Sequence, residues 1–201
     1  SPSAGEIAAG VADEIFGPYP EAPKTEPVKV SDDELKKFVG IWRNEKTHSP
    51  ARFVFENGVS RWSGARLVPT GGGQFTVGEN KLKFTFDKDG KPASAETVDS
   101  DGEVRRFVPE SEWKPMAQEL AAFQGDWFSE EAGAKVTVAI EGEKAFLKQR
   151  PATSLPMQPL YKDHFEVQGY VAWFTRDRNG KVNGMHVGAS RMRDMPFVRV
   201  K

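Results

Sequence analysis

The stretch ELKKFVGIW at residues 34–42 returns 85 residues later as ELAAFQGDW at residues 119–127. After a five-residue insertion in the second copy, FTFDKDGK at residues 84–91 matches FTRDRNGK at residues 174–181. In two ungapped blocks that begin at residues 34 and 69, 18 of 63 aligned positions are identical. Composition alone would give about four identities. The chain therefore contains a duplicated unit, and each copy is large enough to be a domain.

Hydrophobic and polar residues alternate within each unit, as they do in strands with one buried face. The first unit predicts strands near residues 38–43, 52–56, 59–62, 65–68, 74–77, 81–86, 93–98 and 104–108. Asn-Gly and Asp-Gly pairs between these runs supply the positive φ angles of tight hairpins. Eight short strands joined by hairpins are typical of a closed up-and-down barrel.

A short helix precedes the first strand of each unit. Ser31 and Glu34 form a capping-box pattern, which predicts a helical turn before Phe38. The predicted fold is thus all-β, with two tandem eight-stranded antiparallel lipocalin-like barrels, each entered by a short helix. The predicted boundaries are 31–109 for the first barrel and 110–201 for the second. The link from Pro109 to Pro115 is so short that we expect the barrels to pack on each other.

Residues 1–30 differ from both units. Residues 3–16 have the apolar spacing of a short amphipathic helix, and residues 17–27 form a proline-rich linker. The helix is either a terminal tail or a helix packed on a barrel, or else the last helix of an upstream domain. Both interpretations remain open at this point.

Composition excludes several functions. The net charge of the 201 residues is −1, so nothing favours nucleic acid or an anionic membrane surface as a partner. No cysteine is present, which removes disulfides and thiolate chemistry, and no apolar run reaches the length of a membrane span. The compartment is undecided, with a periplasmic or secreted location favoured over a cytoplasmic one.

The shared Gly-x-Trp pattern, at Gly40/Trp42 and Gly125/Trp127, predicts structure rather than binding. We expect the glycine to let the helical turn approach the strand, and the tryptophan to close the barrel end. An eight-stranded barrel of this length can fill its interior with side chains. A packed core is therefore favoured over a ligand cavity.

Candidate catalytic and metal-binding patterns are weak. Ser111 and Lys114 have the Ser-x-x-Lys spacing of penicillin-recognising hydrolases, but Pro115 disfavours the helix that this chemistry needs. His186-Val-Gly188 fits a variant of the third motif of these hydrolases, and we interpret both matches as coincidence. His48, His164 and His186 show no metal-ligand spacing and are expected to be surface residues. We predict no catalytic residue, no cofactor and no metal.

Function is expected where the copies differ, because the residues they share build the fold. Trp173 stands at the position of Lys83 and, since strand side chains alternate, points away from Phe174. It is the best candidate for a contact surface, with the sister barrel or with a missing domain, together with Tyr170. The insertion between Gly142 and Met157 adds Arg150, and the stretch 190–195 adds Arg191 and Arg193.

Residues 174–188, FTRDRNGKVNGMHVG, and the closing FVRV at 197–200 resemble the C-terminal barrel of D-aminopeptidase-type, β-lactamase-related serine hydrolases. Pro159-Leu160-Tyr161 resembles this class too, and the first copy is similar to accessory domains of β-lactamase-related proteins. Such enzymes carry a catalytic domain followed by two lipocalin-like barrels. The resemblance implies a non-catalytic accessory or regulatory region that packs on or gates an upstream hydrolase domain, of which residues 3–16 would be the last helix.

The resemblance carries over no catalytic residue, and one feature departs from it. A long loop of the last barrel can reach the catalytic cleft in two-barrel members, whereas only residues 168–170 lie between Val167 and Val171. The rival hypothesis is a stand-alone lipocalin-like protein that binds a small apolar ligand, which predicts a cavity of several hundred Å³ in one barrel. A third hypothesis is an enzyme that uses Ser111, Lys114 and His186.

Overall fold

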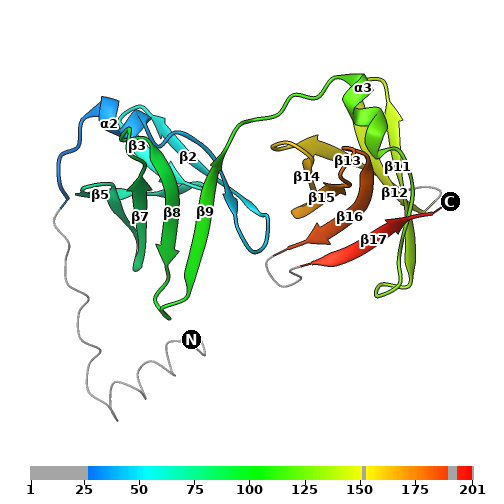
Figure 1. Cartoon of the computed structure of the whole chain (residues 1–201). Helices are drawn as coiled ribbons and strands as arrows, with labels where there is room; N and C mark the ends of the chain where they lie inside the picture. Colours follow the sequence, from blue (N-terminus) through cyan, green and yellow to red (C-terminus); the bar gives the residue numbers. More distant parts are fainter. Residues whose placement is uncertain (1–26, 151–152, 190–193, 201) are drawn as a thin grey trace, which may run out of the picture.

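The computed structural model describes residues 27–150, 153–189 and 194–200, and the side chain of Arg150 is outside that description. Two antiparallel sheets, each curled into a barrel and each with a short helix at one end, make up this part of the chain (Figure 1). The all-β prediction with two barrels is confirmed. The predicted helix and linker of residues 1–26 lie outside the described residues.

The first barrel begins with α2 (Asp32–Lys36) and holds nine strands in the order β4-β3-β2-β1-β9-β8-β7-β6-β5. The strands are β1 (Gly40–Asn44), β2 (Pro50–Glu56), β3 (Val59–Trp62), β4 (Ala65–Arg66), β5 (Val68–Gly71), β6 (Gln74–Val77), β7 (Asn80–Phe86), β8 (Pro92–Val98) and β9 (Val104–Glu110).

One interrupted strand accounts for the ninth element of this sheet. The sequence predicts a single strand over residues 65–68, whereas the structure has β4 and β5 with Leu67 between them. Leu67 is buried and its backbone N–H donates to the carbonyl of Ser60. The two ends of the nine-stranded sheet therefore meet at one residue, although the ladder between them is not continuous.

The second barrel closes completely, in the order β10 to β17 with β17 paired to β10. Its helical entry is α3 (Ala117–Leu120) followed by the 3₁₀ turn η1 (Ala121–Phe123). The strands are β10 (Gly125–Ser129), β11 (Ala134–Glu141), β12 (Lys144–Arg150), β13 (Thr153–Pro159), β14 (His164–Val167), β15 (Tyr170–Arg176), β16 (Val182–Gly188) and β17 (Met195–Arg199).

The same hydrogen bond fixes the helical entry to the barrel in both copies. The indole N–H of Trp42 donates to the Phe38 carbonyl at 3.1 Å, and that of Trp127 donates to the Phe123 carbonyl at 3.2 Å. Both indoles are almost fully buried. Each tryptophan thus satisfies its one polar group locally while it covers the helix-capped end of its barrel.

The glycine before each tryptophan has a different role from the one expected. Gly40 has φ of 149°, and a Cβ added there would meet no atom within 4 Å. A close approach of the helix is therefore not the reason for glycine. The backbone there adopts a positive φ that only glycine adopts without strain, and the equivalent Gly125 does the same at 141°.

Aromatic rings fill the helix-capped half of each barrel. Phe84 lies 4.4 Å from Phe38 and 5.0 Å from Trp42 between ring centroids, and Phe174 lies 4.5 Å from Phe123 in the second copy. These are the residues that the copies share, and all are buried. Tilted and edge-to-face contacts of this kind add to the stabilisation from burial.

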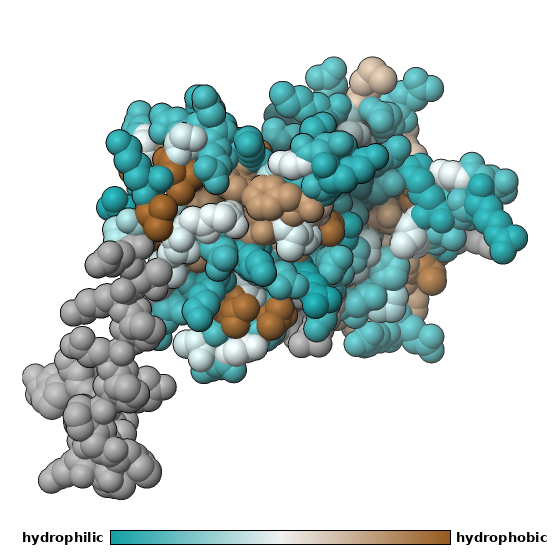
Figure 2. Space-filling model, turned by 60° about the vertical axis from the view of Figure 1, so that its left-hand side comes forward, coloured by the Kyte–Doolittle hydropathy of each residue, from teal (hydrophilic) through white to brown (hydrophobic). Residues whose placement is uncertain are grey.

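The face shown in Figure 2 is mostly hydrophilic, and the hydrophobic groups on it are small and separate. None of the helices in the described part of the chain is long and apolar enough to cross a lipid bilayer.

Candidate functional site

Trp173 lies between the two barrels. It is only 6% exposed, and it forms a buried apolar cluster with Leu160, Tyr161 and Val171 of the second barrel and Ile41 of the first. In Figure 1 the β14–β16 side of the second barrel faces the first barrel. An outward-facing tryptophan is therefore buried by the sister barrel rather than by its own core.

All three histidines of the chain gather at this contact. His164, Trp173 and His186 are direct cross-strand neighbours on β14, β15 and β16. His48, from the turn between β1 and β2, lies 4.3 Å from the Trp173 ring at an interplanar angle of 3°. The sequence predicted surface histidines, and each is partly buried at this contact. Their gathering was not predicted, because the β1–β2 turn and the β14–β16 face are distant in sequence and adjacent only in the folded chain.

His48 also joins the barrels by two hydrogen bonds, one through its side chain and one through its backbone. Its Nδ1 lies 2.9 Å from Nε2 of His164, a hydrogen bond in which one ring donates and the other accepts. The hydroxyl of Tyr161 donates to the backbone carbonyl of His48. Two hydrogen bonds and two stacked ring pairs, with Trp173 and His164, therefore converge on a single turn of the first barrel.

Burial and nearby positive charge favour the neutral forms of these imidazoles. Burial, followed by the charge of Arg43, holds the pKa of His48 below its ordinary value. Burial lowers the pKa of His164 to about 4, and the nearby His48 and Arg43 act in the same direction. Both shifts favour neutral rings near neutral pH, and a neutral ring supplies the acceptor nitrogen that this hydrogen bond needs.

The contact surface differs between the copies in a consistent way. The first barrel carries Gln74, Lys83 and Glu96 at the positions of His164, Trp173 and His186. The row of side chains on β6, β7 and β8 of the first barrel is polar, whereas the equivalent row of the second barrel is aromatic. The shape of the barrel is shared, and only the second copy has the side chains that bury a partner on this face.

Ion pairs lie beside the apolar cluster. Arg43 donates to Glu110 at 2.7 Å, and both side chains are partly buried on the side of the first barrel that meets Trp173. Arg52 contacts Glu112 of the link at 2.6 Å. The N–H of Trp113, also in the link, donates to the Leu160 carbonyl at 3.1 Å. The link is thus bonded to both barrels.

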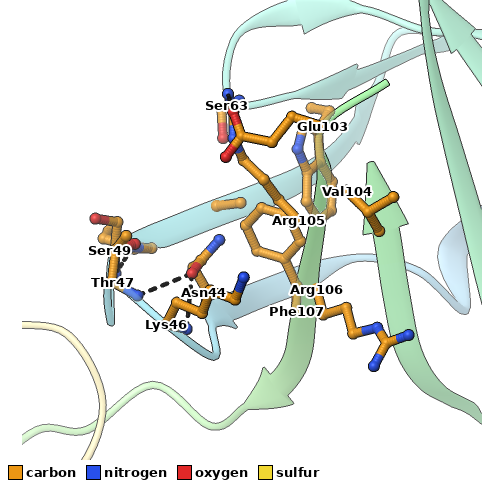
Figure 3. A pocket seen from close by; sticks show the side chains of 13 residues that line it. Asn44, Lys46, Thr47, Ser49, Ser63, Glu103, Val104, Arg105, Arg106 and Phe107 are labelled. Carbon is orange, nitrogen blue, oxygen red and sulfur yellow. Dashed lines mark hydrogen bonds and ion pairs between the residues drawn. The ribbon is translucent and has the colours of Figure 1, made fainter. Parts of the chain in front are cut away.

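Each barrel also opens into a pocket at the end opposite its helix. The pocket of the first barrel has a volume of about 440 Å³. Its rim is polar and charged, with Asn44, Lys46, Glu103 and Arg105 around it (Figure 3). The Asn44 side chain is occupied there, since its Oδ1 accepts from the backbone N–H groups of the β1–β2 turn.

The pocket of the second barrel is larger and apolar. Its volume is about 600 Å³, and it reaches the buried residues Val136, Leu147, Ala172 and Phe197. Tyr170 lies at its rim, half exposed. Tyr170 therefore belongs to the barrel mouth, on the strand face of Ala172 rather than that of Trp173.

The other sequence candidates are placed as follows. Arg191, Arg193 and the side chain of Arg150 lie outside what the structure describes. Ser111 and Lys114 lie in a segment without helical structure, so the helical face that Ser-x-x-Lys chemistry needs is not formed. Across residues 27–150, 153–189 and 194–200, no group of three or more metal-ligating side chains comes together.

The interbarrel residues other than Trp173 carried little signal in the sequence. Leu160 and Tyr161 lie in the connection between β13 and β14, and Ile41 is adjacent to Trp42, a residue that both copies share. The available clue was the difference between copies, because Leu160, Tyr161 and Val171 replace Thr70, Gly71 and Lys81. Apolar residues at positions that are polar in the sister barrel indicate a surface that is covered.

The sequence matches no protein-family model, and no curated protein is significantly similar to it. The resemblance to serine-hydrolase accessory barrels consequently rests on the motifs of the chain itself.

Proposed function

We propose that this chain is the non-catalytic two-barrel region of a β-lactamase-related serine hydrolase of the D-aminopeptidase type. In this role the paired barrels pack on the hydrolase domain of the same polypeptide and hold it in place. The observation that carries the proposal is the buried contact at Trp173, because a pair of barrels tied together presents one continuous surface to a third domain. The motif resemblance supports the class of the partner.

Packing is favoured over gating by the β14–β15 loop. Only Gln168 and Gly169 separate β14 from β15, and both have positive φ, as in a tight two-residue hairpin turn. Such a turn cannot extend into a distant catalytic cleft. A supporting role needs only surface complementarity and a fixed angle between the barrels.

The test compares this chain with the natural polypeptide that contains it. The chain alone should hydrolyse neither nitrocefin nor D-amino-acid amides, whereas the whole polypeptide should carry a Ser-x-x-Lys helix and hydrolyse one of them. In that polypeptide, Trp173→Lys should lower kcat/KM by loosening the support, while Tyr170→Ala should leave it unchanged. Turnover by the isolated chain that Ser111→Ala abolishes would overturn the proposal.

A further inference from the structure

The two barrel mouths occupy the same place in the duplicated fold but are filled differently. Phe53 pairs with Trp62 in the first barrel, and the equivalent pair in the second is Val138 with Leu147. Similarly, Phe75 pairs with Leu82 in one copy and Phe165 with Ala172 in the other. At three inward positions, therefore, the second copy has a smaller side chain: Val138 for Phe53, Leu147 for Trp62 and Ala172 for Leu82.

The smaller side chains of the second copy leave space that Trp62 fills in the first. Its ring lies 5.3 Å from Phe107 and 6.3 Å from Trp42, so it fills the centre of the first barrel. Leu147 stands at that position in the second barrel and lines the pocket together with Ala172 and Phe197. The space taken by an indole in one copy is open to the mouth in the other.

One hairpin at the second mouth is longer. The five-residue insertion lies there, and β12 has seven residues where its counterpart β3 has four. Leu155 of the longer hairpin pairs with Leu147 and extends the apolar wall. Met195 stands where the first mouth has Arg105, so a charged rim position has become apolar.

We propose that the mouth of the second barrel binds a small amphiphile, with its acyl chain or aromatic body in the apolar pocket and its polar end at the rim. The volume of about 600 Å³ lies within the range of small-molecule sites. Gln149 and Gln168 line the rim and offer hydrogen bonds to the polar end, whereas the ammonium of Lys135, also at the rim, is paired with Asp126 at 2.6 Å. The mouth of the first barrel, with Trp62 in its wall, is smaller at about 440 Å³ and has a polar and charged rim. This inference does not depend on an upstream hydrolase domain.

The experiment titrates the whole chain with N-phenyl-1-naphthylamine, an uncharged apolar probe that fluoresces when bound, and then displaces the probe with decanoate. The wild-type chain should bind one probe molecule. Ala172→Leu and Leu147→Trp each restore the side chain of the first copy, and each should raise the dissociation constant at least tenfold. Arg105→Ala, at the rim of the first barrel, is the matched control and should leave it unchanged.

Val187→Thr guards against variants that fail to fold. Val187 lines the pocket, and the first copy has Thr97 at its position, so the change keeps the volume and adds one hydroxyl. It should weaken probe binding severalfold. The proposal is overturned if the wild type does not bind the probe, or if binding is lost in Arg105→Ala. It is also overturned if folded Ala172→Leu and Leu147→Trp chains bind the probe like wild type. If neither of these two variants folds, an unchanged dissociation constant in Val187→Thr overturns it.

Discussion

The ring of His48, in a turn of the first barrel, lies parallel to the ring of Trp173, on the outer face of β15 in the second, with 4.3 Å between their centroids. The residues are 125 positions apart in the sequence. This pair is the centre of the contact between the barrels, because the hydrogen bond to His164 and the buried cluster of Tyr161 both adjoin it. An aromatic stack shielded from water contributes beyond its buried area.

Replacing Trp173 should release one barrel from the other without unfolding either. Trp173→Lys introduces the residue that the first copy carries at this position, where Lys83 lies on the strand surface. A buried lysine would lose its hydration, so the barrels should separate. Small-angle scattering should show a larger radius of gyration with unchanged far-ultraviolet dichroism. Phe128→Ala, on an exposed site of β10, is the control, and equal scattering curves for all three chains would contradict the expectation.

Acid should weaken the same contact. The pKa of His164 falls from 6.5 to about 4 on burial, so the folded chain binds fewer protons than the unfolded chain between these pH values. The free energy of unfolding is then highest above about pH 6.5 and decreases as the pH falls toward 4. The total decrease from His164 is on the order of 3 kcal/mol. The lowered pKa of His48 acts in the same direction.

The measurement for the acid effect is protease cleavage of the link at residues 111–116 as a function of pH, with an acid-tolerant protease. Cleavage should accelerate between pH 6.5 and 4 in the wild type. His164→Gln introduces the first-copy residue Gln74 and removes the titrating group, so its profile should be flatter. Identical pH profiles for both chains would show that His164 does not couple protons to the contact.

Trp127 should be more important to stability than its surface neighbour. Its side chain has no exposure, and its indole N–H is bonded to the Phe123 carbonyl. Trp127→Ala should destabilise the second barrel by about 3–5 kcal/mol, because it leaves a cavity and an unpaired carbonyl. Urea unfolding provides the value. The adjacent Phe128→Ala should cost under about 1 kcal/mol, since Phe128 is 39% exposed.

Gly40 should resist substitution although there is room for a side chain. Its φ of 149° lies in a region that other residues avoid, so Gly40→Ala should cost about 1–3 kcal/mol in thermal or urea unfolding. The adjacent Val39 is 52% exposed, and Val39→Ala should have little effect. A Gly40→Ala chain as stable as wild type would mean that the backbone relaxes at low cost.

Periodicity and turn chemistry predicted most of the strands, because each depends on residues close in sequence. The strands at residues 59–62 and 74–77 are those expected, and Asp89-Gly90 and Asn179-Gly180 lie in turns as predicted. The break at Leu67 was not predicted, since it depends on how the two ends of a curled sheet meet. The function of the chain and its contact with a hydrolase domain stay predictions.

The pocket and the histidine cluster show where sequence reasoning stops. A packed interior was favoured for both barrels, and the first is filled at its centre by Trp62, whereas the second has an apolar pocket beside Leu147 and Ala172. The equivalence of Trp62 and Leu147 could not be seen beforehand, because it falls between the two aligned blocks and becomes clear only from strand register. The histidines were too far apart in sequence to suggest a common site.

The sequence by itself determined the duplication, the strand pattern and the residues that build each barrel, because repeats, alternation and turn residues act locally. It also marked Trp173 as unusual, by the contrast with Lys83. The tertiary structure alone decided that His48 faces Trp173, and that one barrel mouth is open where the other is filled. Those features depend on which faces meet and on how side-chain volumes add up across strands, and neither quantity is encoded in any short stretch of the chain.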